Sequence, residues 1–241
     1  MLTAVTQVVG LKGAEGVVLA SDSQATHGDI RTSQPKLFKT KYGVIWGSAG
    51  PFAGTQDLFT AMEANELEEN PRREEAKAAI QDALLTTAGK LTVGSEQPPS
   101  FEALFAWYDA TDERHYLLHG LRDGRVEFEH RYGSIGVASS LGRFGFARSE
   151  FLELETLPLE LTKMMAHMVA EDVVRASAKG VDLPIQLAVV SRGETHVLRG
   201  AEAEAVSDAV GAFREAQREL LVTAEPPREG APRKGIRPGE R

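Results

Sequence analysis

The strongest constraint on the fold is the order of two hydrophobic patterns, because strand-like and helical segments come in blocks along the chain. The strand-like segments are residues 3–12, 17–20, 36–38, 43–47, 101–110, 115–121, 126–131, 132–137, 185–190 and 196–198. The helical segments are residues 52–67, 72–91, a stretch from about 139, 161–169 and 206–221. Blocks of strands between pairs of helices predict antiparallel sheets with helices outside them, an α+β fold.

Composition excludes several classes of protein. The chain has 241 residues, of which 42% are hydrophobic and 26% charged, enough to bury a sizeable core. The absence of cysteine excludes disulfide scaffolds and thiolate chemistry. A net charge of −8 argues against a nucleic-acid partner. No apolar run reaches the roughly 20 residues of a membrane helix, and the start resembles no secretory signal, so we expect a cytoplasmic protein with no membrane contact.

The domain organisation that we expect is one domain over residues 1–222 and a disordered basic tail over 223–241. From Pro226 onward the sequence PPREGAPRKGIRPGER has no apolar periodicity. A segment of this composition cannot bury enough apolar surface to offset the entropy of ordering it.

Metal and cofactor motifs are missing from the sequence. There is no HExxH, no phosphate-binding or dinucleotide-binding glycine motif and no GxSxG elbow. His115 and His119 are four residues apart, but on a predicted strand that spacing separates them by about 13 Å, too far for one zinc ion. We therefore expect no metal and no cofactor.

The first fifty residues contain a candidate nucleophile set. Thr6 lies on the first predicted strand, Asp22 follows the second, and Lys36 follows a polar loop over 21–35. A threonine hydroxyl needs a positioned base; if Thr6 were the first residue, its own α-amine could act as that base. Lys36 would lower the pKa of the amine, Asp22 would keep the lysine charged, and the N–H of Gly47, on a predicted turn over 47–50, could face the oxyanion. Spacing alone favours the other interpretation, an ordinary exposed strand threonine with Asp22 and Lys36 as loop charges.

The same residues carry a resemblance to a known family. Thr6–Gly13 (TQVVGLKG) and Gly16–Thr26 (GVVLASDSQAT) resemble the opening of proteasome β-type subunits, and are similar to the peptidase subunit of the bacterial two-component ATP-dependent protease. Lys36–Phe38 and Val44–Gly50 (VIWGSAG) are similar to the family's lysine motif and glycine turn. The resemblance implies an N-terminal-nucleophile hydrolase with a four-layer αββα sandwich of two antiparallel sheets, reaching about residue 222.

The resemblance also implies roles for individual residues. Thr6 falls on the nucleophile, Asp22 and Lys36 on the charged pair behind it, and Gly47 on the oxyanion glycine. Substrate-binding roles fall on four residues: Thr26 and Ala49 at the peptide backbone, and Ile45 and Trp46 near the specificity pocket. Trp46 either narrows that pocket or packs away from it.

Several positions depart from the family pattern. Five residues precede Thr6, and the last, Val5, stands where glycine is usual. Val137 replaces a serine, with Ser139 and Ser140 nearby, while Ala176 and Lys179 stand in place of an aspartate and a serine. Asp182 is close in sequence to the missing aspartate and is a candidate to replace it.

Two main functions remain open on these residues. The first is a proteasome-like threonine peptidase that uses Thr6 after removal of residues 1–5; the alternative is a catalytically inactive ring subunit. A third reading, an amidase on small substrates, uses the same nucleophile. The resemblance implies a homo-oligomeric ring, a peptide or unfolded-protein substrate and an ATP-dependent unfoldase partner. The apolar stretch over 157–174 fits either core packing or a ring contact.

Overall fold

The structure is a computed structural model that describes residues 6–27, 30–93, 100–121, 123–177 and 181–223, without the side chains of 25–27, 30 and 31. Two five-stranded antiparallel sheets form its centre within these residues. The first sheet has the order β10-β1-β2-β11-β12, with β1 (Gln7–Lys12), β2 (Gly16–Ser21), β10 (Tyr132–Gly136), β11 (Gln186–Ser191) and β12 (Thr195–Val197). The second has the order β5-β6-β7-β8-β9, with β5 (Leu37–Lys39), β6 (Ile45–Ala49), β7 (Glu102–Asp109), β8 (Arg114–Leu121) and β9 (Val126–Glu129).

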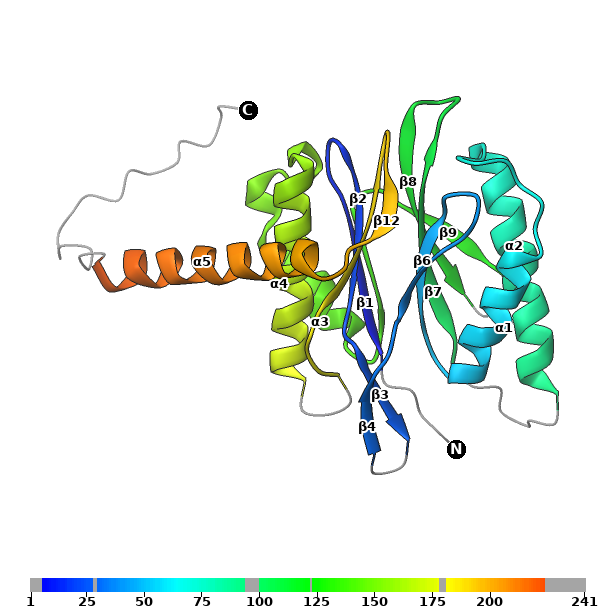
Figure 1. Cartoon of the computed structure of the whole chain (residues 1–241), viewed down its shortest axis with the longest axis horizontal. Helices are drawn as coiled ribbons and strands as arrows, with labels where there is room; N and C mark the ends of the chain where they lie inside the picture. Colours follow the sequence, from blue (N-terminus) through cyan, green and yellow to red (C-terminus); the bar gives the residue numbers. More distant parts are fainter. Residues whose placement is uncertain (1–5, 28–29, 94–99, 122, 178–180, 224–241) are drawn as a thin grey trace, which may run out of the picture.

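Helices cover the outer face of each sheet (Figure 1). The second sheet is covered by α1 (Phe52–Glu63) and α2 (Arg73–Thr92). The first is covered by α3 (Ser139–Arg148), by α4 (Leu159–Ala176) after short 3-10 turns at Glu150–Leu152 and Leu154–Thr156, and by the start of α5 (Ala201–Thr223). The predicted four-layer αββα sandwich is therefore confirmed.

The strands read as continuous apolar runs because both of their faces are buried. Successive side chains of a strand point to opposite faces, so Val8 enters the core between the sheets while Val9 packs under α3 and α4. The same alternation on β6 sends Ile45 between the sheets and Trp46 under α1 and α2. Three contiguous cores result, one between the sheets and one beneath each helical layer.

The prediction of a loop over 21–35 is wrong in part, because this segment contains a short hairpin. Strands β3 (Gln24–His27) and β4 (Ile30–Ser33) pair antiparallel, with Gln24 opposite Ser33. The hairpin projects at the end of the sheets where β1 begins (Figure 1). Its sequence, QATH…IRTS, is polar and lacks the alternation by which a half-buried strand is recognised.

The predicted turn at 47–50 is displaced by three residues. Gly47, Ser48 and Ala49 lie inside β6, and the chain bends only at Gly50, whose φ is +145°. Gly47 is needed for close packing: an added Cβ would lie 2.8 Å from a methyl of Leu37 and 3.1 Å from the carbonyl oxygen of Lys36. A glycine inside a strand often marks such a close approach of backbone.

The last helix, α5, ends at Thr223, so the first residue of the tail predicted over 223–241 is helical. The rest of that tail, residues 224–241, lies outside the described residues, as do residues 1–5. Figure 1 shows α5 crossing α4 and then running away from the sandwich. Among the described helices, none combines the length and apolarity that a membrane crossing requires.

Candidate active site

Thr6, Asp22 and Lys36 meet at one end of the sandwich. Nζ of Lys36 lies 3.2 Å from Oγ1 of Thr6 and 2.7 Å from Oδ2 of Asp22. Thr6 is 5% exposed, Asp22 is 1% exposed and the side chain of Lys36 is 10% exposed. The lysine therefore joins the hydroxyl and the carboxylate in a site that is largely shielded from water.

Strand register explains why residues so far apart in sequence come together. Val8 of β1 pairs with Ser21 of β2, so the start of β1 lies beside the end of β2. Thr6 directly precedes β1 and Asp22 directly follows β2, so both lie at this end of the sheet. Lys36 comes just before β5 in the facing sheet, and its side chain reaches across the gap between the sheets.

The carboxylate of Asp22 is held by several donors. Its Oδ1 accepts a hydrogen bond from the N–H of Gln7 at 2.9 Å, and its Oδ2 accepts one from the N–H of Gln24 at 3.1 Å, besides that from Lys36. Burial raises the pKa of Asp22, and the charge of Lys36 and these N–H groups oppose the shift. Burial lowers the pKa of the Lys36 ammonium, against the attraction of Asp22. A lysine with a lowered pKa gives up its proton more readily than an exposed one.

Gly47 and Ala49 border the site from β6. The close approach of Gly47 to the Lys36 carbonyl places this glycine beside the lysine. Ala49, at the end of β6, lies near Gly136, where a Cβ would come within 3.3 Å of the Ala49 methyl. Both residues that the resemblance places at the oxyanion and at the peptide backbone therefore adjoin the Thr6 region.

Ile45 and Trp46 are both fully buried, so neither presents surface to a peptide. Trp46 packs away from the site: its ring stacks on Phe38 at a centroid distance of 4.6 Å, beneath α1. Ile45 belongs to the core between the sheets. Thr26 lies on β3, and its side chain is outside the described part of the structure.

The β10–α3 side of Thr6 is formed by main chain. The N–H of Val137 donates to the carbonyl oxygen of Thr6 at 3.3 Å, and the side chain of Val137 is 65% exposed. Gly136 has a φ of +98°, and a Cβ there would collide with the Thr6 carbonyl. Ser139 and Ser140 begin α3. The segment thus touches Thr6 through backbone atoms, at the place where the family pattern has a serine hydroxyl.

The second region of departure comprises Ala176 and Lys179, with Asp182 nearby in sequence. Ala176 is exposed at the end of α4. Asp182 is also exposed, and its carboxylate accepts a hydrogen bond from the N–H of Leu183 at 2.8 Å, while its carbonyl accepts one from Ser23. The hydrogen bonds of Asp182 thus go to Leu183 and Ser23, and within the described part of the structure none of them reaches Thr6. Val5 and Lys179 lie outside the described residues.

Two glutamines that the sequence analysis did not single out belong to this neighbourhood. The carboxamide of Gln186, on β11, accepts a hydrogen bond from the N–H of Lys36 at 2.9 Å and donates to the carbonyl of Gln34 at 2.6 Å. Gln7, on β1, is buried next to Thr6. The signal for both was a polar amide inside an apolar strand, since a buried amide without partners is costly.

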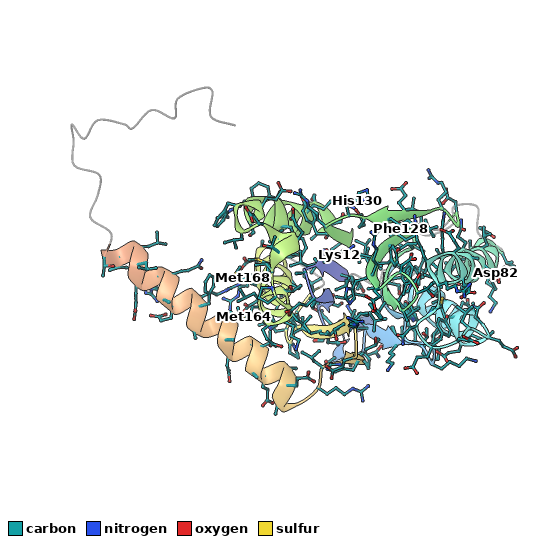
Figure 2. All side chains as sticks on the ribbon, turned by 90° about the horizontal axis from the view of Figure 1, so that it is seen from above. Lys12, Asp82, Phe128, His130, Met164 and Met168 are labelled. Atoms are coloured by element: carbon teal, nitrogen blue, oxygen red, sulfur yellow. The ribbon has the colours of Figure 1, made fainter. Side chains whose placement is uncertain are left out.

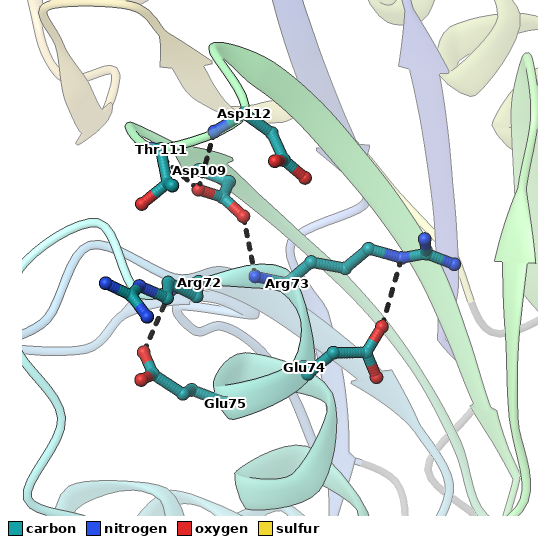
Figure 3. A pocket seen from close by; sticks show the side chains of 7 residues that line it. All are labelled: Arg72, Arg73, Glu74, Glu75, Asp109, Thr111 and Asp112. Carbon is teal, nitrogen blue, oxygen red and sulfur yellow. Dashed lines mark hydrogen bonds and ion pairs between the residues drawn. The ribbon is translucent and has the colours of Figure 1, made fainter.

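A second polar cluster lies at the opposite end of the second sheet, around a surface pocket at the start of α2 (Figure 3). Asp109, the last residue of β7, accepts a hydrogen bond from the N–H of Arg73 at 2.7 Å, and Glu75 accepts one from the N–H of Arg72 at 3.1 Å. These carboxylates satisfy the free N–H groups at a helix N-terminus. Because β7 spans about 23 Å, this cluster is remote from Ala49 and Thr6. Its chemistry is that of helix capping.

His115 and His119, which the sequence analysis set aside as zinc ligands, lie on β8. Among the described residues, no group of three or more histidine, aspartate or glutamate side chains is arranged to hold a metal ion.

Solved structures with a similar fold cover most of the chain. Anbu (ancestral beta-subunit) from Yersinia bercovieri matches with a TM-score of 0.70 and 16% identity over 92% of this chain and 99% of its own. An Anbu (Gly-1) mutant from Hyphomicrobium sp. strain MC1 matches with a TM-score of 0.69 and 19% identity, over 92% and 98%. The Anbu complex from Pseudomonas aeruginosa, described as a helical assembly, matches with a TM-score of 0.70 and 17% identity, over 92% and 98%.

At these identities the structural matches establish the fold alone. No curated protein matches the chain by sequence. The family model described as "Proteasome subunit", in contrast, matches residues 3–185, which is most of the chain. The chain therefore belongs to the proteasome subunit family.

Proposed function

We propose that the protein is a threonine peptidase subunit of the proteasome type, with Thr6 as the nucleophile after removal of residues 1–5. The observation that carries this proposal is the 3.2 Å contact between Nζ of Lys36 and Oγ1 of Thr6, together with the 2.7 Å ion pair between Lys36 and Asp22. Two buried charges are costly, and an arrangement that places one of them on a hydroxyl favours a chemical role.

The first reaction of this site is cleavage of its own chain between Val5 and Thr6. In the intact chain the nitrogen of Thr6 is an amide and cannot act as a base, so the neutral form of Lys36 accepts the hydroxyl proton. Oγ1 then attacks the Val5 carbonyl, the C–N bond breaks, and the Thr6 nitrogen leaves as an amine that takes up the proton. Water hydrolyses the resulting ester, which releases residues 1–5 with a new carboxylate and restores the hydroxyl.

The same steps act on a bound peptide once the amine is free. The α-amine of Thr6 takes the hydroxyl proton and passes it to the leaving amine of the substrate, and water hydrolyses the ester. Lys36 holds a positive charge next to the amine and lowers the pKa of that amine. The N–H of Gly47 is the proposed donor to the oxyanion, Ala49 and Thr26 border the peptide backbone, and the substrate is a peptide or an unfolded protein.

The N-terminal residue of the purified protein tests this proposal. We expect mass spectrometry to find Thr6 first in the wild type, and the full chain from Met1 in Thr6→Ala, which also loses peptide cleavage. Thr60→Ala is the control, because Thr60 is an exposed threonine on α1 and its replacement leaves processing unchanged. Full peptidase activity in a chain that still begins at Met1 would contradict the amine as base.

The second candidate is a catalytically inactive subunit of the same fold. The exposed Val137, which places no hydroxyl beside Thr6, and the outward-facing Asp182 favour it. This candidate predicts an uncleaved N-terminus and no labelling by threonine-directed electrophiles. Retention of the buried Lys36–Asp22 pair favours the peptidase.

Assembly into a homo-oligomer is part of the proposal. An apolar pocket between α4 and α5 is lined by Leu161, Met164, Met168 and Phe213 among others, and Figure 2 shows the two methionines on the side of α4 that faces α5. Leu220, Leu221 and Val222 on the projecting part of α5 are 70–80% exposed. A patch of this kind favours an interface. In this proposal the apolar stretch over 157–174, most of which lies in α4, serves both the core and a contact between copies.

Light scattering of the purified protein tests the assembly. We expect an oligomer for the wild type and a smaller species for the double variant Leu220→Glu/Leu221→Glu. Val93→Glu, directly after the end of α2, is the control and keeps the wild-type size, because the valine is 82% exposed. A monomeric wild type would contradict the assembly. A cytoplasmic location and an ATP-dependent unfoldase that supplies substrate belong to the same proposal.

A further inference from the structure

Gln7 joins Thr6 to a segment that the proposed mechanism does not use. Its Nε2 donates a hydrogen bond to Oγ of Ser134 at 2.7 Å, and its Oε1 accepts one from the N–H of Ala138 at 3.2 Å. Gln7 is 1% exposed and Ser134 is 2% exposed, so both hydrogen bonds are shielded from water. The carboxamide thereby ties β1 to β10 and to the residue at which α3 begins.

The tied segment rests directly on Thr6. Between Ser134 and Ala138 the chain passes through Gly136, which has no room for a Cβ against the Thr6 carbonyl, and through Val137, whose N–H donates to that carbonyl at 3.3 Å. Ala138 is the N-cap of α3, and no described side chain caps the helix there. The hydrogen bond from Ala138 to Gln7 therefore anchors the end of the segment that would otherwise be held least.

The main chain of Gln7 contacts the other side of the site. Its N–H donates to Oδ1 of Asp22 at 2.9 Å, and its carbonyl accepts a hydrogen bond from Oγ of Ser21 at 2.9 Å. One residue thus connects the carboxylate behind Lys36 with the segment over 136–138. The peptide unit between Thr6 and Gln7 makes the same link, because its carbonyl accepts from Val137 and its N–H donates to Asp22.

We propose that Gln7 is a positioning residue: its carboxamide holds residues 136–138 on the Thr6 carbonyl and so fixes the Thr6 hydroxyl within reach of Lys36. A nucleophile displaced by about 1 Å loses about a hundredfold in rate, so small shifts of this segment matter. The inference rests on the proposed function for its kinetic consequence, whereas the holding of the segment does not depend on catalysis.

Three variants of the full chain test the inference. Gln7→Met removes both side-chain hydrogen bonds but keeps the length and burial of the side chain. Gln7→Glu keeps an acceptor for the N–H of Ala138. Thr87→Val is the control, because it removes a fully buried hydroxyl, bonded to the carbonyl of Ala83 at 2.8 Å, on the remote helix α2. For each, two rates are measured: amide hydrogen exchange over 136–138 and labelling of Thr6 by a β-lactone.

We expect Gln7→Met to speed exchange over 136–138 about tenfold and to slow labelling about ten- to a hundredfold. Gln7→Glu keeps exchange close to that of the wild type, and Thr87→Val changes neither rate more than about twofold. Unchanged exchange in Gln7→Met, or equal losses of labelling in Gln7→Met and Thr87→Val, would overturn the inference. If the wild type itself is not labelled, the proposed function fails, and the exchange rate in Gln7→Met alone decides whether Gln7 holds the segment.

Discussion

The two sides of Thr6 offer different chemistry. On one side lie a buried lysine and a buried carboxylate joined at 2.7 Å, with two further N–H donors on the carboxylate. On the other lie the backbone of Gly136 and Val137 and an exposed valine side chain. The first side can move a proton and stabilise charge, whereas the second can orient Thr6 only through its carbonyl.

We infer that the Lys36–Asp22 side activates the hydroxyl of Thr6, whereas the β10–α3 side orients its amine. Buried charges are kept only where partners surround them, and the Lys36–Asp22 side meets that condition. The β10–α3 side has no hydroxyl at Val137 and contacts Thr6 through main-chain atoms. We therefore expect the lysine side to control reactivity and stability, and the valine side to limit turnover.

The largest effect is expected from Lys36→Met, which removes the cation and leaves the Asp22 carboxylate buried without its ion-pair partner. The free energy of unfolding should fall by about 3–5 kcal/mol, and labelling of Thr6 should be lost. Asp182→Asn is the control and should shift stability by less than about 0.5 kcal/mol, because Asp182 is an exposed carboxylate whose hydrogen bond is to its own neighbour Leu183. Urea unfolding of both variants measures the contrast; similar losses in the two would contradict it.

The next effect is expected from Gln186→Leu, which removes the carboxamide that holds the main chain at Gln34 and Lys36. Two backbone groups lose their partner, so stability should fall by about 1–3 kcal/mol, and labelling should slow because the lysine is no longer fixed. Gln186→Glu keeps the acceptor for the Lys36 N–H and should recover part of the rate. A labelling rate in Gln186→Leu that equals that of the wild type would show that Lys36 is positioned by other contacts.

The pH dependence of self-cleavage between Val5 and Thr6 sharpens the assignment of the base. Lys36 must be neutral to accept the proton, so the rate should rise with pH, with an apparent pKa below the 10.5 of an ordinary lysine because burial lowers it. In Asp22→Asn the carboxylate no longer favours the ammonium, so the apparent pKa should fall further. Self-cleavage takes place while the nitrogen of Thr6 is still an amide, so its rate isolates this base from the α-amine. A profile that moves to higher pH in Asp22→Asn would contradict the assignment.

The smallest effect is expected from Val137→Ser, which restores a hydroxyl on the β10–α3 side. Because Val137 is 65% exposed, stability should change by less than about 0.5 kcal/mol. Peptide turnover should rise by up to about tenfold, the value of one added hydrogen bond to the reacting group. Val137→Ala is the control and should leave turnover unchanged. Equal turnover in the serine and alanine variants would mean that this side does not limit the reaction.

Much of the fold follows from local sequence, and the exceptions have physical causes. Strands such as β1 and β7 are recognisable because burial on both faces demands apolar runs. The β3–β4 hairpin carries no such pattern. Gly47 suggested a turn, but its small size serves the close approach of Leu37 and Lys36 inside a strand.

The residues of the candidate site also fall into those that the sequence analysis identified and those that it missed. Thr6, Asp22 and Lys36 were found from the resemblance and the order of the strands. Gln7 and Gln186 were missed because their partners lie 127 to 152 residues away, and only the folded sheets bring them within reach. The partners of Gln7 are the hydroxyl of Ser134 and the N–H of Ala138, and those of Gln186 are main-chain groups of Lys36 and Gln34. A polar amide inside an apolar strand signals that a partner exists, but the residue types do not show which distant group that partner is.

The most direct test of the account is the site of covalent labelling after treatment of the wild type and of Lys36→Met with a β-lactone. We expect tandem mass spectrometry to place one adduct on Oγ1 of Thr6 in the wild type and none in Lys36→Met. The absence of an adduct from the wild type, or equal labelling of the two proteins, would contradict activation of Thr6 by Lys36.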